Sequence, residues 1–175
     1  MQAPDIVLAH WHEFYTLLGT AAGTLVGLLF VAATLATGVF SGERRAPARL
    51  FLTATVVHFS SVLVLSLVVL APIENWSLLG VLVLAGGLLG IAYCGLVWRD
   101  ARRDGLSAAI DLEDRVWYVV LPVAIYLCEV ASGVMLAVGS AAGGVALAVA
   151  LTLLLVVGIH NAWDITIWTV TRRRE

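Results

Sequence analysis

The chain has 175 residues, of which 61% are hydrophobic and only 13% are charged, and its mean hydropathy is +1.00. Soluble domains are roughly half apolar and about one-quarter charged, so this composition excludes an ordinary soluble protein and indicates an integral membrane protein. The formal net charge of −2 supplies no concentrated positive field, and a nucleic acid is therefore not expected as a partner. Cys94 and Cys128 both lie within apolar runs, a pattern that indicates neither a disulfide framework nor a zinc site.

Uninterrupted apolar runs predict five transmembrane helices, because a bilayer core about 30 Å thick is crossed by roughly 20 apolar residues in a helix. The predicted spans cover residues 14–39, 50–71, 76–98, 116–138 and 144–168. The small residues of the segment GSAAGG suit a tight reversal between the last two spans. The sequence therefore predicts an all-α bundle that forms one transmembrane domain over residues 1–175.

The arginines predict an orientation in the membrane. All ten fall in the segment after the first span, in the segment after the third span, or in the tail, and the chain has no lysine. Short cytoplasmic loops retain positive charge, whereas translocated loops lack it. We therefore expect an external N-terminus and a cytoplasmic C-terminus, and no cleaved signal peptide because the first residues carry no positive charge.

The first span carries a glycine row. Gly19, Gly23 and Gly27 recur at four-residue intervals and so share one helical face, where another helix can approach closely. The neighbour is either a helix of the same chain or a helix of a second copy. Gly86 and Gly90 in the third span repeat the pattern and are also predicted packing positions.

Threonines form a second row on the first span, beside the glycines. The hydroxyls of Thr20 and Thr24 either donate to a carbonyl one turn earlier or line a pore. By depth both residues lie about level with Glu129, so a hydrogen bond to that carboxyl is available if the first and fourth spans touch.

Glu129 is the costliest residue in the predicted membrane core. It follows the arginine-bearing end of the fourth span by about thirteen residues, roughly 20 Å at 1.5 Å per residue. An acidic residue at a span centre costs on the order of 2.5 to 3.5 kcal/mol, so Glu129 requires a partner or water. Tyr126, Ser132 and Gly133 share its helical face. Glu129 is either a proton or cation site or a neutral, hydrogen-bonded structural carboxyl.

Two histidines occupy matching depths near the arginine-bearing end, His58 in the second span and His160 in the fifth. Three interpretations remain open: separate hydrogen-bonded core residues, a titrating relay with Asp164, or axial ligands of a haem. His160 and Asp164 are four residues apart, which places the carboxylate one turn from the imidazole. Asn161, beside them, is expected to link helices.

The N-terminal and C-terminal segments together resemble a set of small, mostly uncharacterised bacterial multi-span membrane proteins. These open with the pattern WxxFYxLxGxxAxxLxGLxFV and end with an NAWD segment. The matching positions here are Trp11, Phe14, Tyr15, Leu17, Gly19, Ala22, Leu25, Gly27, Leu28, Phe30, Val31, Asn161, Ala162, Trp163 and Asp164. The resemblance covers about one-quarter of the chain and implies a multi-pass protein of the bacterial inner membrane with no established activity.

These features favour a homo-oligomeric channel or proton or cation conduit in the lipid bilayer. Its pathway would include Glu129, His58, His160, Asp164, Thr20 and Thr24. The principal alternative is a non-conducting accessory or scaffold protein that binds another membrane protein, and a minor alternative is a haem-binding subunit. The motifs of nucleophilic, phosphate-binding and zinc-dependent enzymes do not occur, so we expect no enzyme, no metal and no cofactor.

Overall fold

The computed structural model describes residues 11–35, 45–103 and 112–171, and every regular element in these ranges is a helix. The long helices are α2 (His12–Leu35), α3 (Arg45–Leu70), α4 (Trp76–Arg103), α6 (Leu121–Ala137) and α7 (Ala142–Thr171). The short helix α5 (Leu112–Arg115) and one π-helical turn, η4 (Val116–Val120), lead into α6. Five helical segments are long and apolar enough to cross a membrane, which confirms the predicted all-α bundle.

The helix boundaries extend beyond several predicted spans. Helix α4 continues five residues past position 98 to Arg103, and α3 begins at Arg45, five residues earlier than predicted. Residues 36–39 of the first predicted span lie outside the described residues. Charged residues can extend a transmembrane helix into the headgroup region, so a count of apolar residues alone underestimates helix length.

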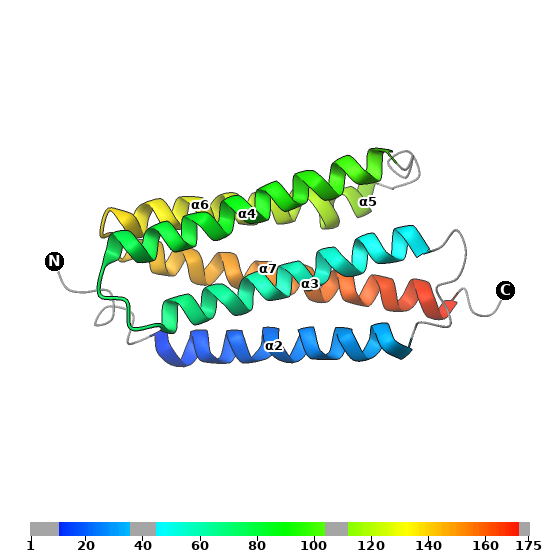
Figure 1. Ribbon diagram of the computed structural model, residues 1–175, viewed down its shortest axis with the longest axis horizontal. Coiled ribbons are helices and arrows are strands. Elements are labelled where there is room, and N and C mark those ends of the chain that lie inside the picture. Colours follow the sequence, from blue (N-terminus) through cyan, green and yellow to red (C-terminus); the bar gives the residue numbers. More distant parts are fainter. Residues whose placement is uncertain (1–10, 36–44, 104–111, 172–175) are drawn as a thin grey trace.

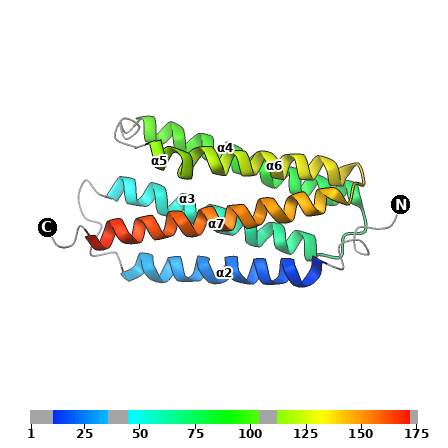
Figure 2. The ribbon, with the colours of Figure 1, turned by 180° about the vertical axis from the view of Figure 1, so that it is seen from behind.

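The helices lie side by side in three layers, as Figures 1 and 2 show from opposite sides: α4 with α6, then α3 with α7, then α2 alone. Helix α2 begins and α7 ends at opposite ends of the bundle, as five alternating helices require (Figure 1). We call one end of the bundle the arginine end. Helix α4 ends there at Arg103, and Arg115 lies there immediately before η4. The sequence predicts that this end is cytoplasmic.

The outer surface of the bundle is apolar. Leu89 on α4 and Leu17 on α2 are 71% and 70% exposed, and many other leucines and valines also face outward. Such a surface is stable when lipid chains cover it. Helix α2 is the most peripheral element and buries only Tyr15, Leu18, Gly19 and Ala22. The hydroxyl of Tyr15 donates a hydrogen bond of 2.9 Å to the carbonyl of Gly144 and so connects α2 to α7.

Glycines bring α4 and α6 into backbone contact. A Cβ atom on Gly133 would lie 2.5 Å from the amide nitrogen of Leu84, and one on Gly80 would lie 2.6 Å from the carbonyl oxygen of Gly133. One on Gly87 would lie 2.9 Å from the carbonyl oxygen of Tyr126. Because the missing side chains allow this approach, the α4–α6 pair is the tightest glycine-mediated contact among the described helices.

The glycine row of the first span packs within the chain over part of its length. A Cβ atom on Gly19 would lie 3.1 Å from Cβ of Ser66 on α3, and one on Gly23 would lie 3.7 Å from Leu63 on the same helix. One on Gly27 would meet nothing within 4 Å. The neighbour of Gly19 and Gly23 is therefore α3 of the same chain, and Gly27 is left uncovered.

The reversal between α6 and α7 uses the conformational freedom of glycine. Gly139 has φ of 78°, its amide donates to the carbonyl of Leu136 at 2.8 Å, and the amide of Ser140 donates to that of Met135 at 2.9 Å. This pattern is a Schellman C-cap, in which a left-handed residue satisfies the last helical carbonyls. The predicted tight turn in GSAAGG is confirmed.

Candidate functional site

Glu129 lies on α6, which packs together with α3, α4 and α7 in a unit of four helices. Its side chain is fully buried, and neither carboxyl oxygen accepts or donates a hydrogen bond within the described residues. As predicted, Glu129 shares one face of α6 with Tyr126, Ser132 and Gly133, and the structure shows that all four residues are buried. Because an unpaired charge costs several kcal/mol in such surroundings, the carboxyl is stable there only with a proton, water or a cation.

A hydrogen-bonded group of side chains lies one helical turn from Glu129. The hydroxyl of Tyr126 lies 2.9 Å from Nδ1 of His58 and 3.3 Å from Oγ of Ser61, so it links α6 to α3. His58 is 1% exposed, and its ring tilts against the phenol ring. Phenol, imidazole and alcohol groups can each both donate and accept a proton, so this triad can pass a proton along its hydrogen bonds.

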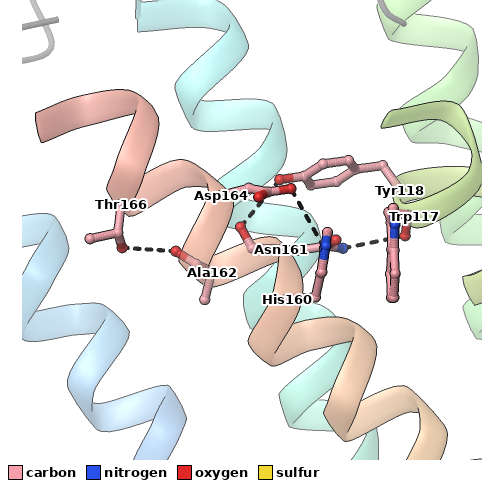
Figure 3. A network of polar contacts seen from close by, with 7 residues as sticks. All are labelled: Trp117, Tyr118, His160, Asn161, Ala162, Asp164 and Thr166. Atoms are coloured by element: carbon pink, nitrogen blue, oxygen red, sulfur yellow. Dashed lines mark hydrogen bonds and ion pairs between the residues drawn. The ribbon is translucent and has the colours of Figure 1, made fainter. Parts of the chain in front are cut away.

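His160 and Asp164 form a second polar group at the arginine end. Nδ1 of His160 lies 3.5 Å from Oδ2 of Asp164, an ion-pair contact without hydrogen-bond geometry. The imidazole stacks on the indole of Trp117, with ring centroids 3.7 Å apart and planes 9° from parallel. Figure 3 shows the two rings side by side, with Asp164 above them. The predicted proximity of His160 and Asp164 is confirmed, whereas the stacking on Trp117 was not anticipated.

Asn161 links α7 to the π-helical turn, as expected from the sequence. Its Nδ2 donates a 3.5 Å hydrogen bond to the carbonyl of Trp117, and its own backbone carbonyl accepts a 3.2 Å bond from the hydroxyl of Tyr118 (Figure 3). The turn explains why the Trp117 carbonyl is available. In a regular α-helix the amide of Leu121 would donate to the carbonyl of Trp117, but here it donates to the carbonyl of Val116. The next residue, Pro122, has no amide hydrogen.

The two histidines belong to separate contacts. A Cβ atom on Gly158 would press into the ring of Phe59, so the backbones next to His160 and His58 are level within about one turn. The matching depth predicted from the sequence therefore holds. However, His58 bonds to Tyr126 and His160 stacks on Trp117, so the two imidazoles engage different residues.

The hydrogen bond from Glu129 to Thr20 or Thr24, which the sequence allowed only if the first and fourth spans touch, does not form. Thr20 donates to the carbonyl of Thr16 at 2.7 Å, and Thr24 donates to that of Thr20 at 2.8 Å. Both residues are exposed on α2, which packs mainly on α3 in the layer farthest from α6 (Figure 1). Equal depth along a membrane does not make two helices neighbours.

Sequence reasoning missed the partners of the buried polar residues. Tyr126 was placed on the face of Glu129, but its bond to His58 depends on which helix lies opposite. Ser61 gave no signal, because a serine in an apolar helix most often bonds to its own backbone. Within the described ranges, no group of three or more His, Cys, Asp and Glu residues could hold a metal ion.

No family model, curated protein or solved structure matches this chain. The interpretation of the site therefore depends on the contacts within the chain itself.

Proposed function

We propose that this membrane protein conducts protons through the unit of α3, α4, α6 and α7, with Glu129 as the proton-binding group. The observation that carries the proposal is a fully buried carboxyl whose two oxygens have no hydrogen-bond partner in the described residues. Intramembrane acids that persist despite their cost are usually part of ion or proton pathways.

The surroundings of Glu129 favour a proton over a metal cation. A hard cation is held by about six or more oxygen ligands, and the hydroxyls nearest in the helix are already bonded elsewhere. Ser132 donates to the carbonyl of Cys128, and Tyr126 is bonded to His58 and Ser61. A single proton, in contrast, neutralises the carboxylate without further ligands and can move through the Tyr126 triad one turn away.

The pathway in this proposal runs through one chain. Glu129 is enclosed by helices of its own protomer, so conduction does not require a shared axis between copies, although a homo-oligomer remains part of the hypothesis. Following the resemblance of the two chain ends, we place the protein in the bacterial inner membrane.

The test is proton flux into proteoliposomes that contain the purified protein, driven by a potassium diffusion potential. We expect flux with the native chain and a decrease of at least about tenfold with Glu129→Gln, which keeps the size of the side chain but cannot bind and release the proton. Thr20→Val serves as the matched control, because this residue bonds only within α2, and it should conduct like the native chain. Tight vesicles with the native protein at every pH would refute the proposal.

A second candidate function is that of an accessory protein which binds a helix of another membrane protein. The observation that favours it is the open face of α2, where Gly27 has no neighbour within 4 Å. Purification from native membranes distinguishes the two candidates. One stoichiometric foreign partner, lost on Gly27→Leu, supports the accessory role, whereas a particle of identical chains contradicts it.

A further inference from the structure

The arginine end contains a buried amide with unused hydrogen-bonding capacity. Asn161 is fully buried, yet its Oδ1 has no hydrogen-bond partner among the described residues. An asparagine side chain can accept two hydrogen bonds and donate two, and this one makes only the long bond from Nδ2 to Trp117. Leaving a buried amide oxygen unpaired is costly, so we expect a small hydrogen-bond donor to occupy the site beside Oδ1 of Asn161.

A second hydrogen-bond acceptor, the backbone carbonyl of Trp117, lies beside the amide of Asn161. The carbonyl of Trp117 is not the acceptor of the Leu121 amide, which donates to the carbonyl of Val116, and Pro122 has no amide hydrogen to donate. Its described donor is Asn161 itself, at 3.5 Å, which leaves a lone pair on the oxygen unused. An unpaired buried amide oxygen beside a second carbonyl suits a water molecule, which donates two hydrogen bonds and is the usual partner of otherwise unsatisfied buried groups.

The stacked rings of Trp117 and His160 lie next to this place. Asn161 is next to His160 in the chain, and Trp117 provides both the stacked ring and the acceptor carbonyl. The side chains of His160 and Asp164 are 30% and 43% exposed. The stacked pair thus adjoins the buried amide of Asn161, and its His160 side chain is partly exposed (Figure 3).

The same place lies one turn from the triad of His58, Tyr126 and Ser61. Asn161 follows Gly158 by three residues on α7, and Gly158 lies against Phe59, the neighbour of His58. Three residues of helix rise about 4.5 Å along the axis, so Asn161 lies about one turn from the level of Phe59. Buried polar groups thus occur at successive levels along the bundle, from Asn161 past the triad to Glu129.

We infer that Asn161 and the π-helical turn hold a water molecule that is the entrance for protons from the arginine end, with the Trp117–His160 stack as its cover. A proton arriving at this water is matched by one passed on toward His58, so the water is regenerated and nothing is oxidised or reduced. The role as an entrance rests on the proposed proton conduction, whereas the hydration of the site does not.

The experiment is infrared spectroscopy of the protein in liposomes during transfer from H₂O to D₂O. The carboxyl band lost in Glu129→Gln identifies Glu129, and the rate at which this band shifts reports how fast water-borne deuterons reach it. We expect Asn161→Leu, which keeps the approximate size but removes both polar atoms, to slow this exchange by at least about tenfold. We expect Trp117→Ala, which removes the cover, to accelerate it.

The slower exchange expected for Asn161→Leu is the diagnostic result, because a variant that merely loosens the fold would exchange faster, not slower. Thr166→Val is the matched control on α7. Its hydroxyl bonds only to the carbonyl of Ala162 and its loss should leave the rate unchanged. Equal rates for the native chain and Asn161→Leu, or the absence of a carboxyl band that depends on Glu129, overturn the inference. Slow exchange in Asn161→Leu without proton flux in the native chain would retain the hydrated entrance and reject only conduction.

Discussion

Replacing Gly133 by alanine should destabilise the bundle, because this residue lies where α4 and α6 touch through their backbones. The new Cβ would be 2.5 Å from the amide nitrogen of Leu84, against 3.4 Å or more for ordinary contact. The two helices must therefore separate by roughly 0.9 Å, and a gap of 0.5 to 1 Å forfeits a quarter to a half of each pairwise attraction along the seam. Overpacking of this kind costs about 1 to 3 kcal/mol.

Thermal unfolding in detergent, followed by the loss of helical circular dichroism, measures this effect. The matched control is Gly95→Ala on α4, where a Cβ atom would meet nothing within 4 Å. Because alanine has a better helix propensity than glycine, Gly95→Ala should leave the free energy of unfolding unchanged or raise it by up to about 1 kcal/mol. If Gly133→Ala melts at the same temperature as Gly95→Ala, the close approach of α4 and α6 is refuted.

Two further predictions concern the triad and the orientation. Tyr126→Phe should lower the free energy of unfolding by about 1 to 3 kcal/mol, because it leaves the buried imidazole of His58 and the hydroxyl of Ser61 without their shared partner. Tyr93→Phe is the control. Equal melting temperatures of the two variants would contradict the hydrogen bonds of Tyr126. In spheroplasts of a cysteine-free chain, a membrane-impermeant thiol reagent should label Ser77→Cys but not Asp114→Cys, since the distribution of the arginines predicts that Asp114 is cytoplasmic. The reverse pattern would contradict the predicted orientation.

The sequence predicts the architecture well because lipid imposes simple rules on it. The number of helices follows from the length of the apolar runs, and the turn at Gly139 follows from its small residues. The inner face of α6 was also predicted, because Glu129 and Tyr126 lie about one turn apart and only one orientation hides the carboxyl. Each of these predictions uses information within a single helix.

The partners across helices could not be predicted, because the helices are apolar over most of their surface and periodicity does not reveal which helix lies opposite. Gly19 indicated a close neighbour but not that it would be Ser66 on α3. Equal depth suggested Thr20 and Thr24 as partners of Glu129, although α2 lies in another layer. The stack of Trp117 on His160 depends on the π-helical turn, for which Pro122 is the only local signal.

A π-helical turn is equivalent to one residue inserted into an α-helix, and each residue of an α-helix rotates the chain by about 100°. The turn at Val116–Val120 thus sets the angular offset between the indole of Trp117 and the carboxyl of Glu129. Shortening the chain by one residue at this point would restore regular winding, and the aromatic ring would swing about a quarter of a circle away from α7 while the acid kept its place. The entrance and the interior of the molecule are therefore aligned by a single extra residue.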